Sequence, residues 1–312
     1  MNAPLPTVTV AVPVLNESVH IEACLRSIVG QTYPAIAEVL VIDGGSDDGT
    51  PFLATAFPRV RVLENPHRLQ AAALNLAIDE GRGEVLVRVD GRCRLAPDYV
   101  QRCVEALAET GAAMVGGAMA PVGEGWIGKG VAAALNSRLG AGPARFHTGG
   151  ASGFVDTVYL GAFRRQLARE AGGYAPDMAI NEDAEFAVRM RPHGGIWFDP
   201  RISSTYTPRR GLRLLARQFY RYGRGRAETV RRHPASLAPR QLAAPALVVG
   251  LISPWRLWVL GAYTLLVGTR SLLWLRRDHR SALGFLLAMP AMHLPWGAGF
   301  ILGLVRPSRP AG

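Results

Sequence analysis

The sequence has little cysteine and almost no lysine. Its three cysteines, Cys24, Cys93 and Cys103, form no CxxC pair and have no histidine nearby at metal-ligand spacing. This pattern argues against a zinc site and against a disulfide framework. We expect the three thiols to be reduced and mostly buried in a cytosolic domain. Lys129 is the only lysine, so arginine carries nearly all of the basic charge.

Acidic residues are outnumbered, with 24 against 35 basic ones and a formal net charge of +11. Such an excess suits nucleic acid, an anionic membrane or phosphorylated substrates, and its position decides between them. Ten arginines and one acidic residue, Glu228, lie between residues 208 and 240, directly before the most apolar part of the chain. This position favours a membrane surface over nucleic acid.

A signal peptide is also missing from the start of the chain. The first 18 residues lack a basic start and a long apolar run, and they pass directly into a strand-like pattern. We therefore expect the folded part to stay in the cytoplasm. With 312 residues and 49% apolar content, the chain can bury one large core or two smaller ones.

From Thr7 to about Arg191, short β-branched runs alternate with longer helical stretches, which is typical of βαβ units. The strand candidates are continuously apolar, as strands covered on both faces are, and span residues 8–12, 38–42, 60–63 and 85–89. The helices are predicted to begin near Ser18, Thr50, Gln70 and Pro97. The glycine-rich stretch 121–153 is predicted to be loop with one short helix over 131–139.

The C-terminal part is strongly apolar. Residues 281–305 contain no Asp, Glu, Lys or Arg, and roughly 20 such residues cross a bilayer core. The stretch from 241 to 269 is interrupted at Ser253-Pro254, which allows a short helix and a span, or a re-entrant hairpin. The hydrophobic segments are therefore about 241–253, 255–275 and 281–305, and a buried soluble bundle is the alternative. The basic cluster Arg276, Arg277, His279 and Arg280 predicts a cytoplasmic turn, with the number of crossings left open.

Polar residues follow three of the predicted strands. Asn16 and Glu17 come after the first strand, and ligands bind beyond the carboxyl ends of strands in open α/β sheets. Glu17 also suits the plain role of a helix N-terminal charge. Asp43 ends the second strand, before two glycines that let backbone approach a ligand. Asp90 follows the fourth strand, where an acidic oxygen suits a divalent ion on a diphosphate.

The turn after Asp43, which reads DGGSDDGT, excludes two common phosphate loops. It contains neither GxGxxG nor a following GK[ST], so it is neither a dinucleotide fingerprint nor a P-loop. Taken alone, it is equally consistent with a glycine turn capped by Asp and Ser.

Together these strand ends resemble the family 2 glycosyltransferases of the nucleotide-diphospho-sugar (GT-A) fold. The resemblance covers nearly the whole soluble part, and it continues through Asn75, residues 161–165, 172–174 and 181–189, and the QFYRYG run at 218–223. It is greatest with bacterial exopolysaccharide glycosyltransferases of the succinoglycan type. The resemblance implies an α/β, Rossmann-like mixed sheet with helices on both faces plus C-terminal transmembrane helices. We place the cytoplasmic domain at 1–235 and the membrane region at 236–312.

The resemblance also implies roles for individual residues. The nucleotide sugar would be bound by Pro13, Glu17, Asp43, Arg68 and Asp90, with Asp90 also at the metal. Asp183 would be the general base that takes a proton from the acceptor hydroxyl. The residues near the acceptor and the diphosphate would be Glu182, Gln218, Arg221 and Tyr222.

The activity implied is that of an inverting hexosyltransferase. A nucleotide-diphospho-sugar, UDP-linked by default, would donate a sugar to a lipid-linked (polyprenyl-diphosphate) or polysaccharide acceptor in cell-envelope or exopolysaccharide biosynthesis. The expected cofactor is Mg²⁺ or Mn²⁺, and the expected location is the bacterial inner (plasma) membrane with the catalytic domain in the cytoplasm. No nucleic acid partner is expected, and homo-oligomerisation is left open.

Two departures from the family pattern leave alternatives. The family commonly has Asp-x-Asp at the metal site, whereas the third position here is Arg92, which cannot ligate a cation. Either Asp90, diphosphate and water hold the metal, or the guanidinium partly replaces its charge. Gly44 stands where many members have a second Asp, which leaves the donor base less certain. Other readings are a non-catalytic membrane scaffold, and a nucleotidyltransferase, which would need a glycine- and lysine-rich loop where PVLNES stands.

Overall fold

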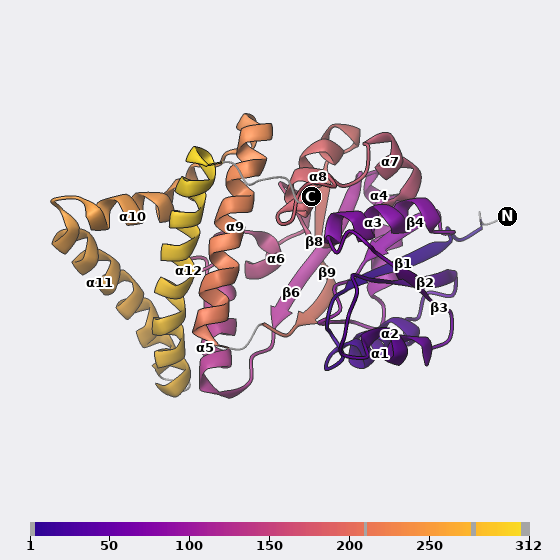
Figure 1. Ribbon diagram of the computed structural model, residues 1–312, viewed down its shortest axis with the longest axis horizontal. Helices are drawn as coiled ribbons and strands as arrows, with labels where there is room; N and C mark the ends of the chain where they lie inside the picture. The colour runs from indigo at the N-terminus through magenta and orange to yellow at the C-terminus, as the bar shows by residue number, and fades with distance from the viewer. Residues whose placement is uncertain (1–3, 209–210, 276–278, 307–312) are drawn as a thin grey trace. The chain divides into compact units, whose positions relative to one another are not determined.

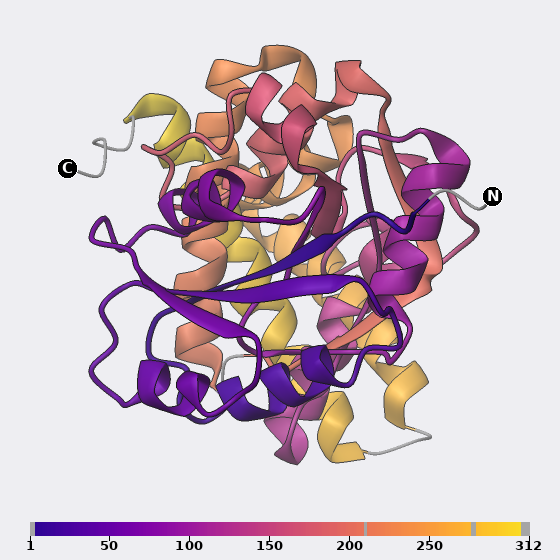
Figure 2. The ribbon, with the colours of Figure 1, turned by 90° about the vertical axis from the view of Figure 1, so that its right-hand side faces the viewer.

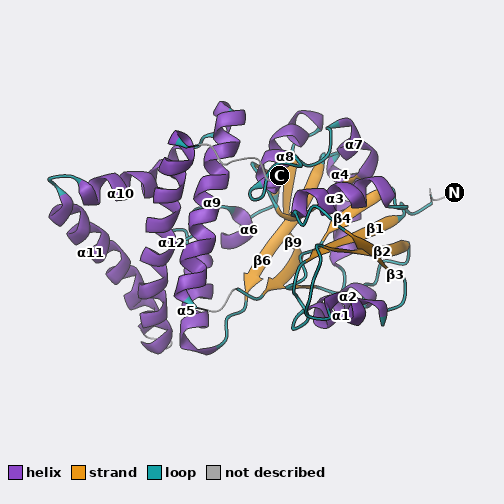
Figure 3. Cartoon of the chain, in the orientation of Figure 1, coloured by secondary structure: helices purple, strands orange, loops and turns teal. Residues whose placement is uncertain are grey.

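The computed structural model describes residues 4–208, 211–275 and 279–306. They divide into two compact units. The strand unit comprises residues 4–120 and 149–206, and the helical unit comprises the described residues of 121–148 and 207–306. Figure 3 shows the strands gathered in the first unit and helices making up the second. The predicted domains, a cytoplasmic one at 1–235 and a membrane region at 236–312, stay predictions.

The strand unit is built on one mixed sheet with the order β3-β2-β1-β4-β8-β6-β9-β5, and β7 pairs with β9. β1 pairs in parallel with β2 and β4, and β2 pairs in parallel with β3. The pairs β4–β8, β6–β8, β5–β9 and β7–β9 are antiparallel. The strands are β1 (Val8–Val14), β2 (Ile36–Asp43), β3 (Val60–Glu64), β4 (Val85–Arg88), β5 (Cys93–Leu95), β6 (Met114–Pro121), β7 (Gly153–Val155), β8 (Tyr159–Arg164) and β9 (Ile196–Tyr206). The four predicted strands and the mixed sheet are confirmed.

Helices cover both faces of this sheet. They are α1 (Ile21–Val29), α2 (Thr50–Thr55), α3 (Gln70–Glu80), α4 (Tyr99–Thr110), α7 (Arg165–Glu170) and α8 (Glu182–Met190). Because side chains alternate along a strand, Val8, Val10 and Val12 share one face and pack with α1, α2 and α4. Thr9 points to the other face, towards the end of α3 at Gly81. Figures 1 and 2 show β1 to β3 between α1 and α2 on one side and α3 on the other.

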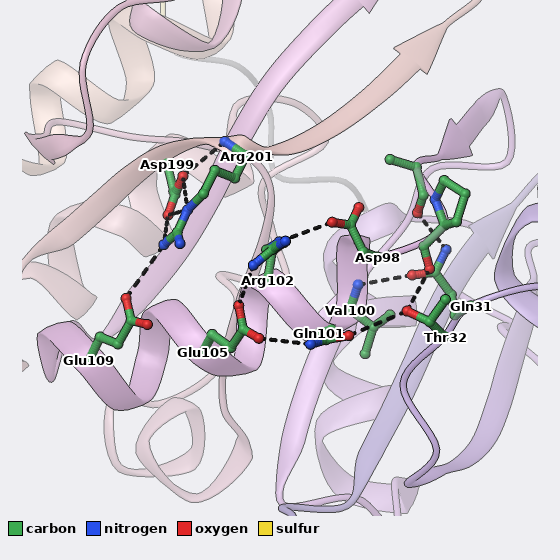
Figure 4. A network of polar contacts seen from close by, with 12 residues as sticks. Gln31, Thr32, Asp98, Val100, Gln101, Arg102, Glu105, Glu109, Asp199 and Arg201 are labelled. Atoms are coloured by element: carbon green, nitrogen blue, oxygen red, sulfur yellow. Dashed lines mark hydrogen bonds and ion pairs between the residues drawn. The ribbon is translucent and has the colours of Figure 1, made fainter.

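A polar network fastens α4 within the strand unit (Figure 4). Arg201 on β9 pairs with Asp199 at 2.7 Å and with Glu109 of α4 at 3.4 Å. Farther along α4, Arg102 binds Asp98 and Glu105, both at 2.9 Å. The contact between Arg201 and Glu109 ties α4 to β9.

The helical unit is arranged around α12. Its helices are α5 (Gly125–Leu135), α6 (Arg145–Thr148), α9 (Leu212–Arg232), α10 (Ala243–Ile252), α11 (Arg256–Leu275) and α12 (His279–Val305). Within this unit, α12 contacts α5, α9, α10 and α11 (Figure 1). Glycines allow the close approach: a Cβ on Gly130 would lie 2.4 Å from Gly284 Cα, and one on Gly223 would lie 2.1 Å from Trp296 O.

The predicted helix over 131–139 was misplaced, since α5 begins six residues earlier and ends at Leu135. Gly130, one of the glycines that suggested loop, is a residue that lets α5 pack on α12. The 3-10 turns are Arg191–His193, Pro234–Ser236 and Pro239–Leu242.

The helical unit also exposes large apolar side chains. Among the described residues, α12 is the one helix whose length and composition suit a membrane span, and residues 239–252 form a shorter apolar segment. Along α10 and α11 the exposed fraction reaches 81% for Ile252, 68% for Trp255 and 79% for Trp258. Arg276 and Arg277 of the predicted cytoplasmic turn lie outside the described residues. The number of crossings and the orientation stay predictions.

Candidate active site at the strand ends

The loops that follow β1 and β2 are tied together by side chains. Asn16 has a positive φ of 55°, and its backbone N–H donates to Ser46 Oγ at 2.8 Å. In return, the Asp47 N–H donates to Asn16 Oδ1 at 3.0 Å. The Glu17 N–H donates to Thr50 Oγ1 at 2.9 Å. The first and second predicted strand ends therefore form one continuous polar surface.

Asp43 organises its own turn. Its Oδ2 accepts hydrogen bonds from the N–H groups of Gly45 and Ser46, both at 3.0 Å, and its Oδ1 accepts one from Ser46 Oγ at 2.5 Å. The residue is buried. Pro13 lies on the neighbouring strand in register with Ile42. Asp43 thus shapes the glycine turn that follows β2.

Arg68 lies on the same turn. Its backbone has a positive φ of 56°, and its Nε and Nη2 donate to the carbonyl oxygens of Gly44 and Gly45 at 3.0 and 3.2 Å. The structure therefore brings Arg68 next to Asp43. A side chain at Gly44 would meet only ordinary contacts, the nearest being Val14 O at 3.5 Å.

Glu17 and Arg92 join the ends of β1 and β4. The strand order reverses between these two strands, because β2 and β3 lie on one side of β1 and β4 lies on the other. Such a switch point is where open α/β sheets bind ligands. Arg92 Nε donates to Glu17 Oε1 at 2.8 Å across it.

Asp90 lies beside this pair. Its Oδ1 accepts hydrogen bonds from Gln70 Nε2 and from Arg88 Nε, both at 3.1 Å. Arg88 is buried, and its Nη1 lies 3.4 Å from Glu182 Oε1. Burial would lower the pKa of Arg88, but the carboxylates of Asp90, Glu182 and Asp183 raise it well above its ordinary value. A permanently charged guanidinium therefore links the end of β4 to the start of α8.

Two neighbouring acids at the start of α8 have different surroundings. Glu182 is buried, and desolvation together with the charge of Asp183 raises its pKa to about 7 against the attraction of Arg88. Asp183 is partly exposed, and its Oδ1 accepts the Ala184 N–H at 2.7 Å. Of the two, Asp183 is the acid that solvent reaches.

The glycine pair before α8 is held by Asn75. Its Oδ1 accepts the Tyr174 N–H at 2.7 Å, and its Nδ2 donates to the Tyr174 carbonyl at 2.8 Å. A Cβ at Gly173, where φ is +65°, would lie 2.6 Å from Asn75 Oδ1. The Tyr174 ring stacks on Phe186 of α8, with 4.1 Å between centroids. Motifs far apart in the sequence thus position α8 and its acids.

Comparison with known proteins identifies the family. The sequence model of "Glycosyl transferase family 2" matches residues 9–172, more than half of the chain and all of the strand ends described above. The chain belongs to glycosyl transferase family 2. It is 36% identical to the succinoglycan biosynthesis protein ExoA of Rhizobium meliloti (strain 1021), and the match covers 93% of each chain.

Solved structures share the fold of this family 2 member. The mannosyltransferase PcManGT from Pyrobaculum calidifontis, in complex with GDP-Man and Mn²⁺, has a TM-score of 0.61 at 22% identity and covers 97% of this chain and 88% of its own. Residues 1–349 of S. aureus TarS, in complex with UDP-GlcNAc, have a TM-score of 0.54 at 15% identity, with 91% of each chain covered. The predicted GT-A-like mixed sheet is confirmed.

The remaining predicted site residues of this glycosyltransferase lie on α9, in the helical unit. Gln218 Nε2 donates to Tyr222 Oη at 2.6 Å, one helical turn away. Arg221 is exposed on the same helix. Their roles at an acceptor or a diphosphate stay predictions, as do the roles assigned to the strand-end residues.

Asp90 would offer a divalent cation one protein ligand. In the described parts of the chain, no three His, Cys, Asp or Glu side chains come together as a ready-made metal site. Oδ2 of Asp90 makes no hydrogen bond to any described residue, so one carboxylate oxygen is available. The residues therefore fit a cation that takes most of its ligands from a diphosphate and water.

Sequence reasoning missed Arg88 and Gln70, which contact Asp90. Arg88 carried a usable signal, because a charged residue inside the apolar run of β4 is rarely buried without partners. Gln70 carried none, since it begins α3 like any polar residue at a helix start.

Proposed function

We propose that this protein is an inverting hexosyltransferase that moves a sugar from a nucleotide-diphospho-sugar, by default UDP-linked, to a lipid-linked or polysaccharide acceptor. The observation that supports it most is the Arg88 bridge, because it joins Asp90 of the proposed donor site to the acids that begin α8. Family membership and the nucleotide sugars in the solved neighbours support the donor class. The ExoA relative supports a place in exopolysaccharide or cell-envelope biosynthesis.

In this proposal Pro13, Glu17, Asp43 and Arg68 hold the nucleoside, and Asp90 lies beside the diphosphate. Bound Mg²⁺ or Mn²⁺ would neutralise part of the diphosphate charge at Asp90. Glu182, Gln218, Arg221 and Tyr222 are assigned to the surroundings of the acceptor and the diphosphate.

The chemical step follows from Asp183. The acceptor oxygen forms a bond to the anomeric carbon while the bond from that carbon to the diphosphate oxygen breaks. The electron pair of the broken bond stays on the nucleoside diphosphate, and the acceptor's proton goes to Asp183. The single displacement inverts the anomeric centre. Glu182 is a poorer candidate for the base, because it is buried and paired with Arg88.

We also propose that the catalytic domain faces the cytoplasm and that the helical unit attaches to the inner membrane. The apolar length of α12 and the exposed Trp and Leu side chains of α11 support a membrane contact. A polyprenyl-diphosphate acceptor stays in the bilayer while a nucleotide sugar stays in water. A membrane-attached enzyme therefore meets both substrates, and formation of a homo-oligomer is compatible with this arrangement.

The test is transfer of a radiolabelled sugar to the lipid fraction of membranes that contain the protein. UDP-linked and GDP-linked sugars are compared for the wild type, Asp183→Asn and Glu64→Gln, an exposed acid at the end of β3 with no assigned role. We expect transfer by the wild type and by Glu64→Gln, and loss of it in Asp183→Asn. Equal transfer by all three would refute Asp183 as the base. No transfer from any donor would favour the scaffold alternative.

A further inference from the structure

Arg92 occupies the position where the family pattern has a metal-binding acid, and the structure shows what its side chain does there. The loop that carries it packs tightly against the loop after β1. A Cβ at Gly91 would lie 3.2 Å from Val14 Cγ1 and 3.4 Å from Glu17 Cγ. Arg92 and Glu17 thus meet at the switch point of the sheet, with side chains only 20% and 12% exposed.

The Arg92 guanidinium is only partly used by the protein. Its Nε binds Glu17, while Nη1 and Nη2 make no hydrogen bond to any residue that the structure describes. The planar, two-nitrogen edge of a guanidinium matches two oxygens of a phosphate group. Glu17 fixes the other side of the guanidinium, so little side-chain entropy is lost when this edge binds an anion.

The Glu17–Arg92 pair is also incomplete without a ligand. Glu17 Oε2 is buried and has no hydrogen-bond partner among the described residues. A buried polar atom without a hydrogen-bond partner destabilises the fold. An ion pair that served only to join two loops would therefore be expected to have all of its buried donors and acceptors hydrogen-bonded. The unused atoms are the buried Oε2 of Glu17 and the Nη1 and Nη2 donor groups of Arg92, all at the switch point between β1 and β4.

Charge points to the same ligand. Replacing a carboxylate by a guanidinium changes the local charge by about two positive units, which equals the charge of one divalent cation. The other guanidinium of the site, Arg88, already balances Asp90 and Glu182. Glu17 neutralises Arg92 formally through Nε alone, and the N–H groups on Nη1 and Nη2 stay available to an anionic ligand.

We propose that Arg92, held by Glu17, binds the diphosphate of the donor directly, so that nucleoside diphosphate binding persists when divalent cations are removed. This inference rests on the proposed function and adds a donor-binding residue to it. Asp90 still offers one carboxylate ligand to a cation. Arg92 directly supplies positive charge that, in a site with two acids, a bound cation would bring to the diphosphate.

The experiment is calorimetric titration of the detergent-purified full chain with UDP and UMP, and with GDP and GMP, in EDTA and in MnCl₂. The variants are Arg92→Ala, Arg92→Lys and Glu17→Gln. Arg94→Ala is the matched control, because Arg94 is an exposed arginine two residues away on β5. Thermal unfolding of each variant shows whether it has folded.

We expect the wild type to prefer the diphosphate over the monophosphate even in EDTA. Arg92→Ala is expected to reduce that preference about tenfold to a hundredfold, as for the loss of a charge-assisted phosphate contact. Arg92→Lys keeps a charge without the planar edge, so it is expected to retain part of the preference, and Glu17→Gln likewise. Arg94→Ala should behave as the wild type.

Three outcomes would overturn the inference. An unchanged preference in folded Arg92→Ala would remove Arg92 from the diphosphate while leaving the proposed function intact. Loss of all diphosphate preference in EDTA by the wild type would show that the cation, and not Arg92, holds the diphosphate. If no nucleotide bound in either condition, the nucleotide-sugar donor of the proposed function would fall together with the inference.

Discussion

Nη1 of Arg88 lies 3.4 Å from Oε1 of Glu182, and both side chains are less than a tenth exposed. This ion pair joins the last residue of β4 to the first residue of α8. The same guanidinium contacts Asp90, so it sets the distance between the proposed diphosphate site and the proposed base. The site is therefore built around a buried charge, and not only from its exposed carboxylates.

Arg88→Met is expected to destabilise the protein by about 3–5 kcal/mol, because it leaves buried carboxylates without their counter-charge. Urea denaturation of the detergent-purified chain measures this change. Above about pH 7, where Glu182 is ionised, the double variant Arg88→Met with Glu182→Gln is expected to recover much of the loss, since it also removes a buried charge. Strictly additive effects would show that the two side chains do not interact.

The raised pKa of Glu182 predicts a pH dependence of stability. The folded protein binds a proton at Glu182 up to about pH 7, whereas the unfolded chain releases it near the ordinary value of 4.5. The stabilisation of the folded protein by this bound proton is thus fully present below about pH 4.5, and it is lost as the pH rises through about 7. We expect the free energy of unfolding to fall over this range in the wild type. The fall should be smaller in Glu182→Gln, and equal slopes in the two proteins would contradict the assignment.

Asp183→Asn is expected to lower the transfer rate about 10²- to 10⁴-fold, which is the usual contribution of a general base. The substitution keeps the shape of the side chain, so affinity for the nucleotide should change little. Single-turnover transfer separates the two quantities. If the rate stayed within a few-fold of the wild type while nucleotide affinity collapsed, Asp183 would be a binding residue.

The parallel strands and the residues at their ends were predictable because their signals are local. An apolar run followed by Asp43 or Asp90 identifies both the strand and the edge where it ends. Burial of Cys24, Cys93 and Cys103 as free thiols was also foreseen.

The antiparallel half of the sheet was not predictable, because its reasons are non-local. Gly116 and Gly117 suggest a loop, yet both belong to β6. A Cβ at Gly117 would lie 1.7 Å from Ile202 O, so the glycine is required by a strand 85 residues away in sequence. The alternation of strands and helices was predicted to end near Arg191, whereas a further strand, β9, runs from Ile196 to Tyr206. This strand was missed because the strands it pairs with are distant in sequence. The partnership of Arg88 with Glu182 likewise depends on two segments that no local pattern connects.

Removal of divalent cations is expected to slow turnover at least about tenfold, and Mn²⁺ or Mg²⁺ is expected to restore it, because a cation stabilises charge that develops on the leaving diphosphate. Transfer rates in EDTA before and after metal addition measure this effect. The affinity for nucleoside diphosphate should fall less than the rate, since Arg92 remains. Full turnover in EDTA would show that this enzyme needs no cation.

The exposed apolar surface of α11 predicts that this helix contributes to membrane binding. Leu257 and Trp258 are 75% and 79% exposed, and transfer of such side chains into lipid is favourable by about 2–3 kcal/mol each. Leu257→Glu and Trp258→Glu should each weaken binding to vesicles roughly tenfold or more, as measured by flotation. Phe52→Glu is the control, because Phe52 is 80% exposed but lies on α2 of the strand unit. If all three substitutions released the protein equally, loss of apolar surface in general, and not contact of α11 with lipid, would be the cause.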